Sequence, residues 1–459
     1  MNPEMFSMVV SGTILVVLFT AGVHIGATLA VAGIAGAIAF TGNAASGLNM
    51  LLLQTMDVSA SYTLMVIPLF IVLGALASAS GVTTDLFACF YRWMGRISGG
   101  VAVAVIATCA GMASITGSSV ATAAAMSKIA MPEFRRFNYR EDMAVGAIAT
   151  GGTLSIMIPP SITLVLFALF AEASVGKLLI AGILPGFMIA ALYGIMIYTR
   201  CRMNPELGPL GQEFTWKERW ASLPPVIPFF FIVGSILFGI LAGIWTPVES
   251  AAVGVVLVTV MGFVRKRLTI KAVFDATVDG VVTSSSVFLV VIGSLVYGQF
   301  LALNGFAETI TDTVAAMNLS PFMLFCLLMV IYFILGCLME VSSILALTVP
   351  LFMPLITHVD GTRCGWGHCG VDDGSGGRHT AGGPQPLCGQ GGAAWKIALD
   401  TIYKGSTPYW IMNVIAVYVL YAFPEIALYL PSKMLRNSGL TLATWRARGR
   451  QGITMAASA

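Results

Sequence analysis

Charged side chains are scarce in this sequence of 459 residues, in which 24 Lys and Arg and 21 Asp and Glu together make up 10% of the chain. A soluble domain carries roughly 25% charged residues. A surface with so few charges would not stay solvated in water, and 57% of the residues are hydrophobic. The composition therefore excludes an ordinary soluble protein and requires most of the surface to face lipid or other protein.

Sequence features of three other kinds are also missing. There is no G-x-x-x-x-G-K-S/T phosphate loop, which a primary pump would need for its nucleotide. The five cysteines in apolar segments have no paired ligand spacing, so a disulfide framework is not indicated. The N-terminus has neither a basic region nor a small-residue cleavage site, so we expect the first apolar stretch to be a retained helix.

Long apolar stretches recur along the chain. Eight of them have the length of a membrane-spanning segment: Met8–Leu29, Ser61–Ala79, Leu178–Tyr198, Val226–Ile244, Val248–Val264, Ser285–Leu303, Phe322–Leu338 and Tyr409–Leu430. About 20 apolar residues cross the hydrocarbon core as a helix, and internal helical bonding is what lets a backbone sit there. The sequence predicts an all-α, multi-pass membrane protein. Clusters of Arg and Lys in the short connections are candidate cytoplasmic loops.

The two halves of the chain share short motifs. Four pairs align at offsets of 221 to 224 residues: Gly22–Gly33 with Gly243–Gly254, Ser80–Val82 with Asn304–Phe306, Met131–Pro132 with Met353–Pro354, and Gly182–Pro185 with Gly405–Pro408. Four pairs at nearly one offset indicate a duplication, and transporters place their sites at such repeat interfaces. A duplicated scaffold without a transport role is the alternative. We expect a first repeat over 1–221, a second over 222–432 and a disordered extension over 433–459.

A polar interruption lies in the first repeat. Residues 111–122 place Ser, Thr and Gly in an otherwise apolar stretch, and the next stretch contains Gly151-Gly152 and Pro159-Pro160. Proline removes an amide donor and clashes with the preceding turn, so this second stretch should break within the membrane. The pattern predicts a re-entrant hairpin at 100–130 and a broken helix at 143–170. Freed carbonyls and hydroxyls would form an oxygen cage suited to Na⁺, and half-helix N-termini would attract an anion.

These features also have plainer interpretations. A hydroxyl in a membrane helix often bonds the carbonyl one turn back, and small residues let helices pack closely. Glu249 and Glu340 are acids inside the apolar part of the chain, which makes them candidates for function. An intramembrane enzyme would need a nucleophile and a base. Ser118 or Ser119 could be the nucleophile, but His24, the histidine of the apolar segments, aligns with Trp245 in the repeat and is expected to pack.

Three motifs together resemble a known family: Gly117–Thr122 (GSSVAT), Ile158–Ser161 (IPPS) and Thr246–Ala252 (TPVESAA). They are similar to motifs of the large membrane subunit of tripartite ATP-independent periplasmic (TRAP) transporters, over about residues 5 to 432. The resemblance implies an elevator-type secondary transporter with two inverted repeats and a second hairpin at about 322–357. It implies sodium-driven uptake of a small organic anion, a C4-dicarboxylate or related carboxylate. The partners would be a small four-helix membrane subunit and a periplasmic solute-binding protein, at the bacterial inner membrane and without nucleic acid.

The resemblance also carries over site residues. The first-half sodium site would fall on Thr116, Ser118, Ser155, Ile158 and Pro160, mostly through backbone carbonyls, with Na⁺ as the coupling ion and no other cofactor. Ser155 stands where the family usually has glycine, which leaves its carbonyl available. The family's aspartate in the second hairpin appears here as Glu340. Other small and hydroxyl residues are candidates to line the substrate cavity: Gly117, Ser119, Thr122, Ser161, Ser342 and Ser343.

Residues 360–394 differ in character from the rest, being rich in glycine and polar residues. Five of them could be taken for metal ligands: Cys364, His368, Cys369, His379 and Cys388. We expect no transition-metal site, because the repeat requires a membrane-embedded partner of Pro159-Pro160 near residue 382. Read one base later from His368, the back-translated codons permit an apolar run with a double proline under Thr380 and Ala381. We therefore expect a local frameshift, restored by Ala394–Trp395, from a sequencing error or a damaged gene.

Two consequences follow for function. A chain that truly has the printed residues 360–394 would transport little or nothing, because the second half would lack its broken helix. A stand-alone sodium/dicarboxylate carrier of the same superfamily is the alternative to a tripartite transporter. The cargo itself is not readable, since in a tripartite system the binding protein would hold most of the selectivity.

Overall fold

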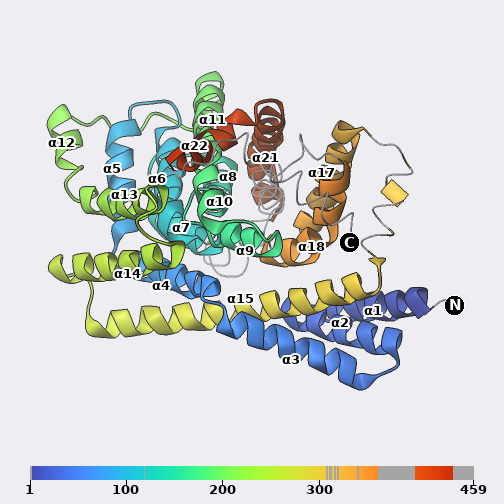
Figure 1. The fold of residues 1–459 in the computed structure, drawn as a ribbon. Coiled ribbons are helices and arrows are strands. Elements are labelled where there is room, and N and C mark those ends of the chain that lie inside the picture. Colours follow the sequence, from blue (N-terminus) through green and yellow to red (C-terminus); the bar gives the residue numbers. More distant parts are fainter. Residues whose placement is uncertain are drawn as a thin grey trace.

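The part of the protein that the structure describes is all-helical and has the apolar helices of a multi-pass membrane protein. A computed structural model describes residues 3–117, 119–306, 320–338, 341–359 and 399–437, together with 309, 313, 314 and 317. Every regular element in these ranges is a helix (Figure 1). Among the described residues, four helices are long and apolar enough to cross a membrane, and up to six if each of two bent pairs counts as one span. The predicted fold class is therefore confirmed.

The described helices divide between the two halves of the chain. The first half holds α1 (Pro3–Thr20), α2 (Ile25–Thr41), α3 (Ala44–Ala60), η1 (Thr63–Met65), α4 (Val66–Ala79), α5 (Val82–Met94), α6 (Gly100–Thr116), α7 (Ser119–Arg136), α8 (Glu141–Thr153), η2 (Leu154–Ile156), α9 (Ile162–Phe170), α10 (Val175–Ala181), α11 (Ile183–Met203) and η3 (Pro205–Leu207). The second half holds α12 (Trp216–Ala221), α13 (Ile227–Leu241), α14 (Pro247–Val264), α15 (Ile270–Leu303), α17 (Pro321–Leu338), α18 (Val341–Val359), α21 (Leu399–Ala422) and α22 (Glu425–Asn437).

The helices form two layers. In Figure 1, α1, α2, α3 and α15 lie side by side in a lower layer with α4 and α14, and α6 to α11 stand above it with α21. Two large buried apolar clusters lie in the bundle: one includes α9 and α10 as well as α4 and α15 and so spans both layers, the other lies in the upper layer, and α6 contributes to both. Met112 and Ile115 of α6 belong to the cluster around α4 and α15, whereas Val105 and Ala113 belong to the cluster around α8 and α11. The end of α6 therefore lies where the layers meet.

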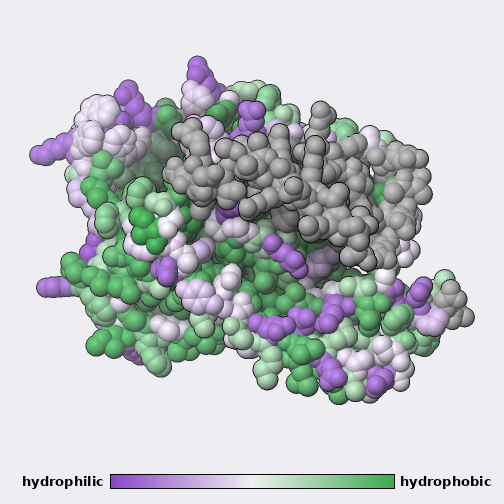
Figure 2. Space-filling view, in the orientation of Figure 1, coloured by the Kyte–Doolittle hydropathy of each residue, from purple (hydrophilic) through white to green (hydrophobic). Residues whose placement is uncertain are grey.

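Apolar and hydrophilic side chains are distributed over the surface as in a protein that faces lipid. Large apolar side chains are exposed on α14 and α15, among them Val256, Val260 and Phe274. Apolar residues dominate this part of the surface in Figure 2, and hydrophilic residues project at the edge beyond α11 and α12. Arg200 and Arg202 lie in the last turn of α11. Such a division matches an apolar belt bordered by a polar interface.

Two of the predicted spans are interrupted. The stretch Met8–Leu29 is not one helix, because α1 ends at Thr20 and Gly22 turns the chain with a φ of 76°. The stretch Tyr409–Leu430 is divided where α21 meets α22 at an angle of 61°. Mean apolarity does not mark either turn, so the sequence-based prediction of single spans was wrong at both places.

Two further predictions need correction, one for His24 and one for the C-terminal extension. His24, expected to pack, is exposed and caps α2, since its Nδ1 accepts a hydrogen bond from the amide of Gly26 at 3.3 Å. The predicted disordered extension from residue 433 is wrong for residues 433–437, which belong to α22. Residues 438–459 lie outside the described part.

The internal repeat is visible in the backbone. Gly22 and its repeat partner Gly243 have φ values of 76° and 69°, and Gly81 and Gly305 have 74° and 72°. Glycine adopts this left-handed conformation at no steric cost. The aligned glycines therefore make the same turn in each half. The predicted limits of the two repeats remain a prediction.

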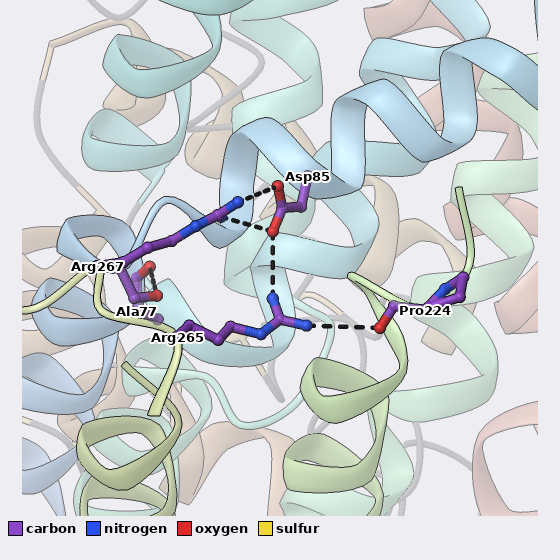
Figure 3. A network of polar contacts seen from close by, with 6 residues as sticks. Ala77, Asp85, Pro224, Arg265 and Arg267 are labelled. Carbon is purple, nitrogen blue, oxygen red and sulfur yellow. Dashed lines mark hydrogen bonds and ion pairs between the residues drawn. The ribbon is translucent and has the colours of Figure 1, made fainter. Parts of the chain in front are cut away.

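An ion-pair network joins the two halves at the start of α5 (Figure 3). Arg267 donates to both carboxylate oxygens of Asp85 at 2.7 and 3.1 Å, and Arg265 donates to Asp85 Oδ2 at 3.2 Å. Arg265 also reaches the carbonyl of Pro224 at 3.5 Å. The carboxylate lies in the first turn of α5, where the amide end of a helix favours an anion. This network fastens the α14–α15 connection to the α4–α5 turn.

Glycines let helices of different halves cross with their backbones in contact. A Cβ on Gly405 of α21 would overlap the carbonyl oxygen of Asp142, and a Cβ on Gly146 of α8 would overlap the carbonyl of Gly405. Gly26 of α2 and Gly293 of α15 meet in the same way in the lower layer. Each layer thus contains at least one crossing of the two halves that tolerates no side chain.

We expect Gly405→Ala to destabilise the protein by about 1–3 kcal/mol, the usual cost of forcing a methyl group into a packed position. The measurement is the melting temperature of the detergent-solubilised protein. Gly12→Ala is the control, because a Cβ on Gly12 of α1 meets nothing within 4 Å. Equal melting temperatures for the two variants would contradict the close α8–α21 crossing.

Candidate functional site

The first hairpin turns at a glycine that touches the start of α9. Gly117 ends α6 with a φ of 55°, and α7 begins at Ser119. A Cβ on Gly117 would lie 3.1 Å from Ile162 Cγ1 and 3.2 Å from the Ile162 amide nitrogen. The hairpin tip therefore lies directly against the chain that follows the double proline. Ser118 lies outside the described residues.

The predicted helix break is present between α8 and α9. Helix α8 ends at Thr153, and after the turn of η2 the chain does not become helical again until Ile162. Ser161 caps α9, because its Oγ accepts from the amide of Leu164 at 3.4 Å and donates to the carbonyl of Ile156 at 2.5 Å. The prediction of a broken helix is confirmed in its position. The second helix of the hairpin is longer than predicted, since α7 continues beyond residue 130 to Arg136.

Three buried hydroxyls connect the hairpin to the break. Thr116 Oγ1 and Thr122 Oγ1 are 2.7 Å apart, and Thr122 Oγ1 is 2.9 Å from Ser155 Oγ. Thr116 donates its proton to the carbonyl of Met112 at 3.0 Å. A hydroxyl has one proton to donate, so Thr122 must donate to Thr116 and Ser155 to Thr122. Every hydrogen bond of the series is therefore donated toward Met112. The Ser155 hydroxyl oxygen accepts no hydrogen bond within this series, so its lone pairs are not used there.

All three hydroxyls are buried. Thr116, Thr122 and Ser155 are 5%, 1% and 0% exposed. Buried polar groups are costly unless they are paired, and these pair with each other across three elements, α6, α7 and η2. The plainer interpretation, in which each hydroxyl only bonds its own helix, holds for Thr108 of α6, which donates to the carbonyl of Ala104 at 2.6 Å. It does not hold for Thr122 and Ser155.

Glycines bring neighbouring backbones close to the tip and the break. A Cβ on Gly74 of α4 would lie 2.9 Å from Thr116 Cα and 3.1 Å from the Thr116 carbonyl oxygen. A Cβ on Gly152 would lie 2.7 Å from the carbonyl oxygen of Ser119, and one on Gly182, between α10 and α11, would lie 2.6 Å from that of Met157. The site is thus enclosed by backbone, with carbonyl oxygens on several sides.

Helix ends of both polarities meet here. The carbonyl end of α6 and the turn of η2 bring partial negative charge, whereas the amide ends of α7 and α9 bring partial positive charge. A cation beside the first pair and an anion beside the second would each be stabilised. The arrangement can hold two ions of opposite sign near each other.

Most residues predicted for the first-half site lie together. Thr116, Gly117, Ser119, Thr122, Ser155 and Ser161 belong to the tip and the break, and Ile158 and Pro160 are buried within the break. Thr122 was predicted only to line the substrate cavity, but it is the middle member of the hydroxyl chain. Thr122 lies one helical turn after Ser119 in α7, on the same side of the helix, and this spacing could have indicated its place beside the hairpin tip.

Only some of the candidate residues in the second half lie in the described part of the chain. Ser343 is buried and Ser342 half-buried at the start of α18, which contacts α9. Glu340 and residues 360–394 lie outside the described residues. Glu249 is not an acid buried in the bundle. It is exposed and forms a capping box at the start of α14, where its carboxylate accepts from the amide of Thr246 at 2.7 Å.

Comparison with known proteins identifies the family. The family described as "Tripartite ATP-independent periplasmic transporter, DctM component" matches residues 13–364. The chain belongs to this family. It is 30% identical to the C4-dicarboxylate TRAP transporter large permease protein DctM of Pseudomonas aeruginosa, over 70% of this chain and 75% of that protein. It is 28% identical to the 2,3-diketo-L-gulonate TRAP transporter large permease protein YiaN of Escherichia coli, over 64% of this chain and 69% of that protein.

A solved structure shares the fold. The YdaH transporter of Alcanivorax borkumensis matches 84% of this chain and 90% of its own with a TM-score of 0.58 and 14% sequence identity. The chain is thus a TRAP large membrane subunit, a transport protein and not an enzyme. The resemblance drawn from the GSSVAT, IPPS and TPVESAA motifs is confirmed.

Proposed function

We propose that this TRAP subunit couples sodium to the import of a small organic anion, a C4-dicarboxylate or related carboxylate. The observation that carries the proposal is the hydroxyl chain from Thr116 through Thr122 to Ser155, which joins the hairpin tip to the helix break. Hard monovalent cations prefer oxygen ligands, and this place offers three hydroxyl oxygens and the carbonyls of two interrupted helices. On binding of sodium, the three hydroxyl groups would rotate so that their oxygen atoms face the ion and their protons point away from it.

The anion would bind beside the cation, at the amide ends of α7 and α9. Helix N-termini stabilise carboxylates, and a neighbouring sodium ion would offset the remaining charge. The names of two relatives in the family, for C4-dicarboxylate and 2,3-diketo-L-gulonate, support an organic acid as cargo. The layer of α6 to α11 would carry both ions past the layer of α1 to α4, α14 and α15, as an elevator, in the bacterial inner membrane.

Reconstitution tests the coupling. Proteoliposomes with this subunit, its small four-helix partner and the periplasmic binding protein should accumulate the cargo only with an inward sodium gradient. Uptake that proceeds equally in potassium would refute sodium coupling. Uptake by this chain without the binding protein would instead favour the stand-alone carrier.

We also propose that residues 360–394 result from a local frameshift. The family match ends at residue 364, just inside this segment, which supports a change of reading frame there. Re-sequencing the DNA across codons 358–396 tests the sequencing-error form of the proposal. If the reads confirm the printed frame, the gene itself is damaged, and the encoded chain lacks the second broken helix.

A further inference from the structure

Two buried nitrogen atoms lack a hydrogen-bond partner where α12 packs against α5. They are Nε1 of Trp93 and Nε of Arg219. Both nitrogens can only donate. No carboxylate in the part of the chain that the structure describes forms an ion pair with Arg219. Buried polar atoms of natural proteins are nearly always paired, so these two donors indicate a ligand that brings acceptor oxygens and negative charge.

Indole rings border the guanidinium group of Arg219. Trp216, Arg219 and Trp220 lie on one face of α12, because residues three and four positions apart are neighbours on a helix. Trp93 of α5 contacts both indoles of this face edge to face, with ring centroids 6.3 Å from Trp216 and 5.7 Å from Trp220. The guanidinium carbon of Arg219 lies 5.0 Å from the centre of the Trp216 ring, in a cation–π contact. We call these four residues the tryptophan–arginine cluster.

The tryptophan–arginine cluster lies at the surface, at the end of an apolar helix. Trp216 and Trp220 are 65% and 61% exposed. Helix α13 begins at Ile227, directly after the turn that ends α12, and its Phe230 and Phe231 are exposed, as expected for a helix that faces lipid. Figure 1 shows α12 next to α5 at the edge of the bundle. Tryptophan prefers the level where acyl chains meet polar headgroups, so the cluster lies where a phospholipid headgroup would be.

The residues around the cluster favour an anion. The acidic residues before and within α12 are already occupied, because Glu213 pairs with Arg96 at 3.3 Å and Glu218 closes the capping box of α12. Arg219 and the exposed Lys217 remain as cations. A guanidinium group binds phosphate through strong, charge-assisted hydrogen bonds, and basic residues at a membrane surface attract anionic lipids. A free phosphate ion would use the charge but leave the exposed indoles without an apolar neighbour, whereas a lipid satisfies both.

We propose that the tryptophan–arginine cluster binds the phosphate group of an anionic phospholipid such as phosphatidylglycerol. The phosphate oxygens accept hydrogen bonds from the Arg219 guanidinium and the Trp93 indole. The indoles of Trp216 and Trp220 contact the glycerol backbone and the first carbons of the acyl chains. The Trp216 ring rotates away from the guanidinium to admit the phosphate, because both donor atoms are buried in the free protein. The exposure of this ring leaves it room to rotate.

Native mass spectrometry of the full chain in detergent tests this inference, with titrations of phosphatidylglycerol, phosphatidylcholine and inorganic phosphate. Phosphatidylglycerol should bind in preference to phosphatidylcholine, whose choline group neutralises the phosphate. Arg219→Gln should weaken that binding about tenfold or more, because it removes the charge from the hydrogen bonds to phosphate. Trp93→Phe keeps an aromatic ring but removes one donor, and should weaken binding about threefold or more.

The matched control is Lys217→Gln, which removes one positive charge from the same helix outside the cluster. Its side chain is exposed and its charge is screened by salt, so the affinity for phosphatidylglycerol should change about twofold or less. The melting temperature of each variant shows that it folds. If Arg219→Gln does not fold, Trp93→Phe decides, and an unchanged lipid affinity in that variant contradicts the proposal.

Four further outcomes would overturn the inference. Equal losses of affinity in Arg219→Gln and Lys217→Gln would show attraction by net charge alone. Binding of phosphatidylcholine as tight as that of phosphatidylglycerol would show a contact that does not use the charge. Inorganic phosphate that binds as tightly as the lipid would show a site for a free anion. Complete loss of phosphatidylglycerol binding when the small membrane subunit is added would show that a protein covers this face.

Discussion

Replacing Thr122 by valine is expected to remove most of the sodium-dependent rise in the melting temperature of this protein. Valine keeps the shape of threonine but removes the hydroxyl that connects Thr116 to Ser155. The proposed ion loses one oxygen, and the two remaining hydroxyls lose the bond that orients them. At a sodium concentration of about 100 times Kd, one site stabilises the folded state by about 2.7 kcal/mol. Most of that stabilisation should disappear.

The measurement is thermal unfolding in sodium chloride against choline chloride at equal ionic strength. It needs no partner and no transport, and the first-half residues are intact in the printed chain. Thr108→Val is the matched control, because Thr108 is a buried threonine of the same hairpin whose hydroxyl bonds only its own helix. Thr108→Val should keep the sodium response. A sodium response that survives in Thr122→Val would refute the placement of the ion at this hydroxyl chain.

Restoring the reading frame across codons 368–394 is expected to turn an inactive chain into an active transporter. The printed chain has its first-half site but lacks the double proline that the repeat requires near residue 382. In the proposed mechanism both half-sites close around the ions, so uptake by the printed chain should be at background. The restored chain should transport at least tenfold above it, which corresponds to about 1.4 kcal/mol or more in the barrier.

The measurement is sodium-driven uptake by proteoliposomes that contain either chain with its small membrane subunit and binding protein. The control is the restored chain with Thr122→Val, which should return uptake to background by removing the first-half site alone. Uptake by the printed chain at the level of the restored chain would show that residues 360–394 are functional as printed. The frameshift proposal would then be wrong.

The hairpin and the helix break could be predicted from the sequence because their signals are local. Proline removes a donor wherever it stands, and Pro159-Pro160 after Gly151-Gly152 therefore marks a break without any knowledge of the fold. The break lies between Thr153 and Ile162, as expected. The turn at Gly22 was missed for the opposite reason. Glycine is also common inside membrane helices, so a single glycine in an apolar stretch does not distinguish a turn from a helix.

Contacts between distant segments could not be predicted. The role of Thr122 depends on Ser155, which lies in another helix, and motif similarity assigned these two residues to different ions. The pairing of Asp85 with Arg265 and Arg267 joins segments about 180 residues apart, and nothing in the local sequence of α5 indicates it. The internal repeat was the one long-range signal in the sequence, and the matching turns at Gly81 and Gly305 agree with it.

The absence of a side chain at Gly74 has a mechanical consequence. Because the backbone of α4 rests almost directly on the backbone of Thr116, no flexible group lies between them to absorb a displacement. A cation that enters between Thr122 and Ser155 and spreads the hairpin by a fraction of an ångström would push on α4 at once. Occupancy of a small site would thereby be transmitted as a force to the opposite layer, and a bulkier residue at position 74 would keep the layers apart whether or not the ion is present.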